Sequence, residues 1–188
     1  MKKTLLFLFL MVSLIALGQE QANETIKSKS KSVEFMEKEG SFLKKEFYKL
    51  GKVKGVECEV LIMTDLVENT KVGCLRLLTS RISGSQYVGT LDSDEIAAAT
   101  QCMEYIKEQV LPTRPDVYTE YMYLSRDNVK LGVYSEYING YVGNDMRWRI
   151  FVQTRIWLDS KEYFNAKHLD KLIEYLKQAK QMIEEKTK

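Results

Sequence analysis

Residues 91–107, LDSDEIAAATQCMEYIK, decide the predicted fold, because a similar stretch, LDSKEYFNAKHLDKLIEYLK, returns at residues 158–177. Each stretch has an aspartate followed three positions later by a glutamate, the spacing of a capping box at a helix N-terminus. Apolar residues then recur every three or four positions, as on a helix that buries one face. The two stretches therefore predict two amphipathic helices and an internal duplication of the chain.

The two copies differ at their N-terminal ends. Asp92 and Glu95 have the capping spacing in the first copy, and Asp159 and Glu162 have it in the second. The second copy then contains three additional residues, which makes Asn165 an alternative N-cap for the second helix.

Strand patterns precede each predicted helix. Residues 56–63 alternate between apolar and polar side chains, as expected of a strand with one buried face. Turn residues at 68–70, 126–128 and 139–140 separate neighbouring strands. A helix remains an alternative for residues 42–50. The predicted strands are residues 33–36, 42–50, 56–63, 72–79, 86–90, 118–125, 130–138 and 146–158.

Runs of strands followed by a helix, twice over, predict the α+β class. We expect one antiparallel sheet of about six to eight strands with two main helices on one face. Pro112 and Pro115 end the first helix and divide the domain, residues 33–188, into two related halves. Each half is predicted to be strand-strand-strand-helix, at about residues 54–112 and 115–186.

The N-terminus has the features of a secretory signal peptide. Lys2 and Lys3 precede an apolar run, and Ala16 and Gly18 provide small residues for cleavage before Gln19. The residue directly after that point is not a cysteine, and the first cysteine of the chain is Cys58, so the mature protein is not expected to be a lipoprotein. Residues 19–32 are polar and are predicted to form a solvated tether. The protein is therefore expected to be exported, to the periplasm or as a secreted protein.

Charge restricts the class of partner. The whole chain carries 28 basic and 26 acidic residues, and removal of residues 1–18 takes away two lysines, which leaves 26 of each sign. A chain with no net charge has no global attraction for nucleic acid. We therefore expect no nucleic-acid partner and no stable membrane insertion after cleavage, and an envelope protein or a glycan as the partner.

Few residues are suited to catalysis or to metal binding. The single histidine, His168, lies in the predicted second helix and is expected to be exposed, which weakens any triad built on it. Cys58, Cys74 and Cys102 form no Cys-x-x-Cys pair, so neither a zinc site nor another metal is predicted. No glycine-rich phosphate loop occurs, and no cofactor is expected. The three thiols are predicted to be buried and reduced, with a Cys58–Cys102 disulfide as the alternative.

The acidic residues have two interpretations. Asp92, Asp94 and Glu95 are adequately explained as a helix start, and so are Asp159 and Glu162. A glycosidase would instead need two carboxylates that converge in a cleft within about 10 Å of each other. We predict no catalytic residue and keep a carbohydrate-active or other hydrolase as the alternative.

One predicted strand carries the residue types of a binding surface. Arginine and aromatic side chains alternate on one side of residues 146–158, and two tyrosines of residues 118–125 could extend the same patch. Ordinary cross-strand packing, with the arginines paired to glutamates, is the other interpretation. The candidate binding residues are Arg147, Arg149, Phe151, Arg155, Trp157, Tyr121 and Tyr123.

Residues 44–48 (KKEFY), residues 74–77 (CLRL) and the helix start at Leu91 resemble small exported proteins of the Bacteroidetes that contain a domain of unknown function. The resemblance implies export and brings no activity or functional residues with it. The leading hypothesis is a non-enzymatic binding or protein-interaction module of the cell envelope.

Overall fold

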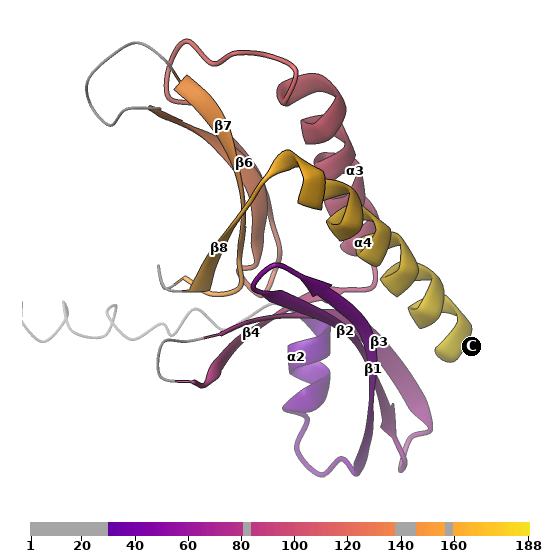
Figure 1. The fold of residues 1–188 in the computed structure, drawn as a ribbon. Coiled ribbons are helices and arrows are strands. Elements are labelled where there is room, and N and C mark those ends of the chain that lie inside the picture. Colours follow the sequence, from indigo (N-terminus) through magenta and orange to yellow (C-terminus); the bar gives the residue numbers. More distant parts are fainter. Residues whose placement is uncertain (1–29, 81–83, 138–145, 157–159) are drawn as a thin grey trace, which may run out of the picture.

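The protein folds into two antiparallel sheets of four strands each, and the prediction of a single sheet is wrong (Figure 1). The computed structural model describes residues 30–80, 84–137, 146–156 and 160–188. The α+β class is confirmed. The first sheet contains β1 (Leu43–Val53), β2 (Val56–Asp65), β3 (Thr70–Ser80) and β4 (Gln86–Asp92), and the second contains β5 (Glu120–Leu124), β6 (Lys130–Tyr137), β7 (Met146–Gln153) and β8 (Lys161–Phe164).

A helix follows each sheet. The first sheet leads into α3 (Ile96–Tyr105), which continues as a π-helical turn at Ile106–Val110, and the second leads into α4 (Ala166–Lys186). Each half therefore has four strands and a helix, not three strands and a helix. The additional strands are β1, which begins before residue 54, and β8, which occupies residues predicted to start the second helix. The order of four strands and a helix occurs twice, and the duplication of the chain stays a prediction.

Each long helix packs on the sheet of the other half. Helix α4 contacts β1, β2 and β3, whereas α3 contacts β5 and β6, and the two helices contact each other (Figure 1). Burial of the apolar stripes of both helices joins the two sheets into one hydrophobic core. The inner face of each sheet is therefore buried by the helix of the other half, so each half depends on the other for its core.

A third helix, α2 (Lys31–Met36), covers the opposite face of the first sheet (Figure 1). Phe35 and Met36 pack against Leu61, Met63 and Cys74 there. The predicted strand at residues 33–36 is thus a helix. The predicted tether also ends earlier than residue 32, because Ser30 and Ser32 are buried. The predicted signal peptide and the rest of the predicted tether lie outside the described residues.

The structure confirms some of the predicted turns and helix starts and contradicts others. Asn69 and Asn128 adopt positive φ at the predicted turns, and residues 42–50 form a strand and not the alternative helix. Asn165 is the N-cap residue of α4, although its side chain makes no capping bond. Glu162 lies on β8, so the capping box predicted for it is wrong. Asp159 and the 139–140 turn lie outside the described residues.

The two sheets meet at the edge of β4. Asp127 accepts hydrogen bonds from the Thr90 amide at 2.9 Å and from Nη1 of Arg155 at 2.9 Å. The hydroxyls of Thr79 and Thr154 lie 2.7 Å apart. These buried contacts hold the second sheet in one orientation relative to the first, with its inner side toward the helices.

Candidate binding surface

The outer face of the second sheet faces away from both long helices (Figure 1). Side chains alternate along a strand, and cross-strand partners share a face. Val133, Ile150 and Val152 point inward to the core, so their neighbours on β6 and β7 point outward. The register places Tyr134 opposite Arg149 on this outer side.

Aromatic rings form a continuous cluster on that outer side. Tyr134 lies at its centre, with its ring centroid 6.5 Å from Tyr118, 5.9 Å from Phe151 and 6.2 Å from Tyr163. The rings are inclined to one another by 41° to 62°, an arrangement that aromatic pairs favour over face-to-face stacking. We call the outward side chains of the second sheet the aromatic face. It comprises Tyr118, Tyr134, Phe151 and Tyr163 with Arg147, Arg149 and Lys161.

Basic groups lie directly on these rings. The Lys161 ammonium lies 3.8 Å from the centroid of Phe151 and 4.7 Å from that of Tyr134. Burial lowers the pKa of Lys161, and the attraction of Glu120 opposes that shift. The Arg149 guanidinium lies 5.5 Å from the Tyr163 centroid. Cation–π contacts of this kind hold positive charge against the faces of the rings.

The two outward arginines share one carboxylate. Glu136 is 2.9 Å from Nε of Arg147 and 3.3 Å from Nε of Arg149. This is the cross-strand pairing that the ordinary-packing interpretation expects. One carboxylate does not neutralise two guanidinium groups, so the aromatic face keeps a net positive charge around Tyr163. A cavity of about 190 Å³ adjoins it, between the start of β7 and the N-terminus of α4.

The predicted binding residues do not all lie together. Arg147, Arg149 and Phe151 lie on the outer side of the second sheet, but Phe151 is 0% exposed, so it supports the rings around it and is not itself accessible to a partner. Tyr121 and Tyr123 point to the opposite side of the sheet, where Tyr121 contacts Trp148 at 5.9 Å, so they do not extend the patch. Arg155 lies beyond the end of β7 and is bound to Asp127. Trp157 lies outside the described residues.

Four members of the aromatic face were not selected from the sequence. Tyr134 follows the alternation of the predicted 130–138 strand and could have been found from it. Lys161 and Tyr163 lie on β8, whose sequence predicts a helix start. Tyr118 precedes β5 and is placed only by its ring contact with Tyr134.

The acidic residues at the start of α3 are engaged in structural contacts. Asp92 is 2% exposed and accepts hydrogen bonds from the hydroxyls of Ser30 and Ser32 and from two backbone amides of α2. Its own amide donates to Glu95, as in a capping box, at 3.0 Å. The carboxylate of Asp92 caps no amide of α3, so that part of the prediction is wrong.

Arg126 completes this cluster. It forms ion pairs with Asp94 and with Asp92, the latter at 3.1 Å, and its amide donates to Glu95 at 2.8 Å. The hydrogen bond from Arg126 lowers the pKa of Asp94 to about 2. A catalytic general acid needs a shift in the opposite direction. In the described part of the chain no group of three His, Cys, Asp or Glu side chains is arranged to hold a metal ion.

The cysteines add no reactive thiol, and the histidine packs against an aromatic ring. All three thiols are free, and burial raises the pKa of both Cys58 and Cys74 to about 12. The thiolate is the reactive form, so these two groups are unreactive at neutral pH. Cys102 is half-buried, and its pKa is also raised by burial. His168 is half-buried beside Phe164 and not exposed as predicted.

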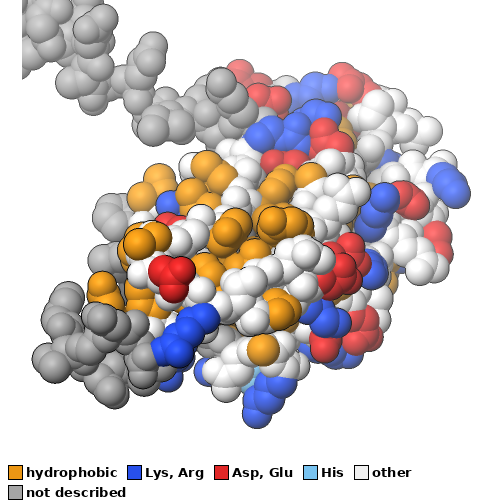
Figure 2. Space-filling view, turned by 90° about the horizontal axis from the view of Figure 1, so that it is seen from above, with side chains coloured by type: hydrophobic (Ala, Val, Ile, Leu, Met, Phe, Trp, Pro, Cys, Tyr) orange, Lys and Arg blue, Asp and Glu red, His pale blue; other side chains and the backbone are white. Residues whose placement is uncertain are grey.

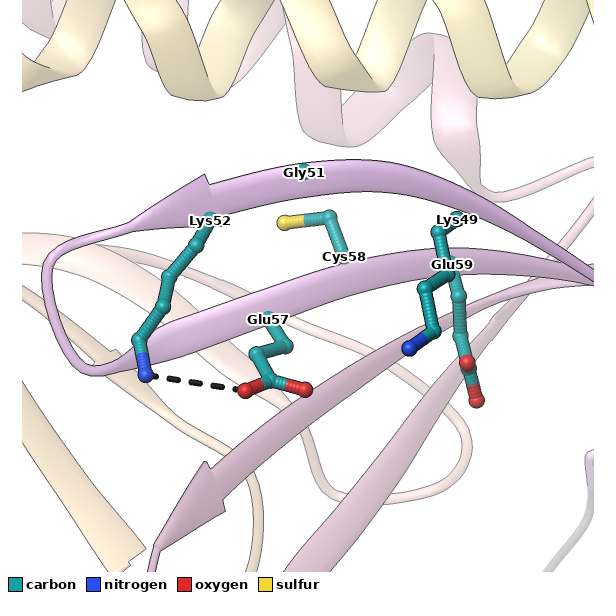
Figure 3. Close-up of a pocket in the computed structure, with 6 residues that line it drawn as sticks. All are labelled: Lys49, Gly51, Lys52, Glu57, Cys58 and Glu59. Atoms are coloured by element: carbon teal, nitrogen blue, oxygen red, sulfur yellow. Dashed lines mark ion pairs between the residues drawn. The ribbon is translucent and has the colours of Figure 1, made fainter.

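A separate cavity of about 240 Å³ lies between β1 and β2 (Figure 3). The register shifts between Lys49 and Gly51, and this bulge separates the two strands locally. The buried Cys58 side chain points into the gap, and Lys52 forms an ion pair with Glu57 at 3.5 Å beside it (Figure 3). With an unreactive thiol and a paired lysine, the cavity has no evident chemistry.

Within the described residues, no helix combines the length and the apolar character needed to cross a membrane. No protein-family model matches the chain, and no curated protein matches it.

Proposed function

We propose that the protein is a non-enzymatic binding module exported to the cell envelope, and that the aromatic face contacts an envelope protein or a glycan. The observation that carries this proposal is the central position of Tyr134 among three other rings on a sheet face that no described helix covers. Tyrosine and arginine are the side chains that contribute most to binding energy in protein interfaces.

A protein partner fits the aromatic face better than a flat sugar ring does. The rings are inclined to one another, and Lys161 covers Phe151, so no broad planar platform is presented. Inclined rings form a contoured surface that side chains of a partner can fill. The excess of basic over acidic groups favours a partner segment that carries carboxylates.

A hydrolase remains the alternative, and the contacts of the acids weaken it. Asp92 is buried under α2, and the pKa of Asp94 is lowered to about 2. Asp94 is therefore ionised at neutral pH and cannot donate a proton as a general acid. A binding role requires no such group and agrees with the unreactive thiols.

Photo-crosslinking in the cells that make the protein tests the proposal. A benzophenone amino acid would replace Tyr118 or Tyr163 on the aromatic face, and Phe42 or Val67 as exposed apolar control positions elsewhere. We expect one discrete adduct from the first pair and none from the second. An Arg149→Glu substitution should reduce that adduct at unchanged folding, because it reverses charge on the aromatic face.

Equal adduct yields from both pairs of positions would overturn the proposed surface. A glycan partner would instead appear as an adduct that glycosidase treatment shortens. Hydrolysis of an envelope polysaccharide by the purified protein, abolished by Asp94→Asn with folding unchanged, would replace the binding module with the hydrolase.

A further inference from the structure

Three of the four sheet edges are protected against pairing with another strand. Strand β1 carries Lys44, Lys45, Lys49 and Lys52 and a bulge before Gly51. These features are the usual defences of an exposed edge. The outward amide of Thr90 on β4 is bonded to Asp127, and the carbonyl of Tyr163 on β8 accepts a bond from Lys54.

Strand β5 has neither the lysines nor the bulge of β1, and no described residue bonds its outward backbone groups. Its sequence, EYMYL, contains no lysine, arginine or proline, and its register with β6 has no bulge. Met122 and Leu124 are 45% and 51% exposed, although both are apolar. Tyr105 and Val117 are exposed as well. Figure 2 shows hydrophobic side chains gathered in a broad patch on the upper side of the molecule, where the second sheet lies.

The backbone of β5 has outward hydrogen-bonding groups at alternate residues. Ser135 donates its amide to Thr119, and Ser125 donates its amide to Val129, so the odd-numbered residues of β5 pair with β6. In an antiparallel ladder the intervening residues direct their N–H and C=O groups to the other side. Glu120, Met122 and Leu124 therefore form the free edge of the sheet, in the sense that no described strand pairs with it.

We propose that β5 pairs with β5 of a second copy of this chain, antiparallel and about a two-fold axis at Met122. This inference goes beyond the proposed function and does not rest on it. The register places Glu120 opposite Leu124 of the other copy and Met122 opposite its counterpart. It uses every outward group of the strand, for about six backbone hydrogen bonds, and forms an isologous contact.

Charge complementarity selects this register. Leu124 pairs with Lys130 in the β5–β6 ladder, so Glu120 of one copy and Lys130 of the other would lie in one cross-strand row. Two strand spacings separate them, about 10 Å, which both side chains can span. Within one chain the same two residues are offset by four positions along the strand, about 13 Å. A register with Glu120 opposite its own counterpart would oppose like charges.

Pairing would create one eight-stranded sheet. The axis is perpendicular to the sheet, so the aromatic faces of both copies would lie on the same side. Any ligand with two equivalent epitopes would then bind with the added strength of bivalency.

The mass of the protein purified from the cells that make it, measured by native mass spectrometry and light scattering, is the first test. We expect two chains per particle. Met122→Lys and Met122→Pro should each shift the population to single chains, because a lysine blocks an edge and a proline removes one outward donor. Val67→Lys, at an apolar turn position that is 70% exposed, is the matched control and should leave the dimer intact.

Charge reversal tests the register. Glu120→Lys and Lys130→Glu should each weaken the dimer, and the double variant should restore it. Amide hydrogen exchange gives an independent signature: the amides of Glu120, Met122 and Leu124 should be protected in the dimer and lose protection on dilution.

A particle of one chain at every concentration would overturn the inference, as would a dimer that survives both Met122 variants. Failure of the double variant to restore the dimer would exclude this register. If single chains crosslink through position 122 to a different protein, β5 is a strand-addition edge for that partner and not a self-pairing edge.

Discussion

The hydroxyl of Ser32 donates a 2.6 Å hydrogen bond to the carboxylate of Asp92, sixty residues later in the chain. The amide of Ser32 donates to the same oxygen at 3.0 Å, and Arg126 pairs with the other oxygen at 3.1 Å. Asp92 therefore fastens α2 and the connection between β5 and β6 to the end of the first sheet.

Replacement of Asp92 by alanine should destabilise the protein far more than loss of a helix cap. Several buried donors would lose a charged acceptor, which we expect to cost about 3 kcal/mol or more, against about 1 kcal/mol for a simple cap. Urea unfolding measures the loss, and hydrogen exchange of residues 31–36 reports release of α2. Asp116→Ala, in an exposed connection, is the control. A loss of about 1 kcal/mol with α2 still protected would return Asp92 to a capping role.

The acid stability of the protein should depend on Asp94. Its pKa is lowered from 3.8 to about 2, chiefly by the hydrogen bond from Arg126, so the stabilisation is present above pH 3.8 and is lost as the pH falls toward 2. Arg126→Ala should raise the pKa of Asp94 and flatten this loss. An NMR titration of the side-chain carboxyl carbon measures the shift, with Lys167→Ala as the control. An unchanged titration in Arg126→Ala would contradict the assigned cause.

Gly89 is placed where the two sheets touch. A Cβ atom there would lie 2.5 Å from the carbonyl oxygen of Thr154 and 2.4 Å from Cγ2 of Val129. Because a backbone atom cannot move aside cheaply, Gly89→Ala should cost about 2 kcal/mol or more. Gly40→Ala is the comparison, since φ at Gly40 is 74° but no atom lies within 4 Å of the added carbon. It should cost only the backbone strain, about 1 kcal/mol. Equal melting temperatures for the two variants would contradict this account of the junction.

Thiol labelling should follow burial. At mildly alkaline pH we expect an alkylating reagent to modify Cys102 first, because it is only half-buried. Cys58 and Cys74, whose pKa is about 12, should react only as fast as the protein unfolds. Intact-mass spectra over time give the order, and labelling in concentrated denaturant shows that all three can react. Early modification of Cys58 would show that the cavity between β1 and β2 admits reagents.

Lys161 should reduce stability at neutral pH. Burial against Phe151 lowers its pKa, so the unfolded chain binds this proton more tightly, and stability rises with pH as the folded-state pKa is passed. Lys161→Met keeps the apolar contact and removes the charge, and it should raise the melting temperature. Lys167→Met, on the exposed start of α4, should leave it unchanged. A lower melting temperature for Lys161→Met would mean that the cation–π contacts outweigh desolvation.

Elements that depend on neighbouring residues were predicted correctly from the sequence, and elements whose local pattern is short or ambiguous were not. Residues 56–63 and the turns at Asn69 and Asn128 were found because alternation and positive φ are properties of a few neighbouring residues. Strand β8 was not predicted because its first two residues belong to the LDSKE motif, which is similar to the start of the first helix. The sequence predicts a strand at residues 33–36 because α2, with six residues, is too short to show a helical period.

In the candidate site too, the sequence groups residues of one strand correctly but does not group residues of different strands. Arg147, Arg149 and Phe151 were placed together by alternation within one strand. The β5–β6 register, which alternation along one strand does not determine, put Tyr121 and Tyr123 on the other side. Tyr134 and Lys161 reach the same cluster from different strands, which only the assembled sheet reveals.

By itself, the sequence determined the two amphipathic helices, most of the strands and the repeated order of elements, because periodic burial is encoded in neighbouring residues. Only the tertiary structure decided that the strands form two sheets, that each helix covers the sheet of the other half, and that Asp92 holds α2. Those outcomes depend on which apolar surfaces meet. Alternation along a strand predicts that one face is buried, but it does not identify the helix or sheet that buries it. Among the described residues, this choice leaves the aromatic face without a helix against it and the outer edge of β5 without a neighbouring strand.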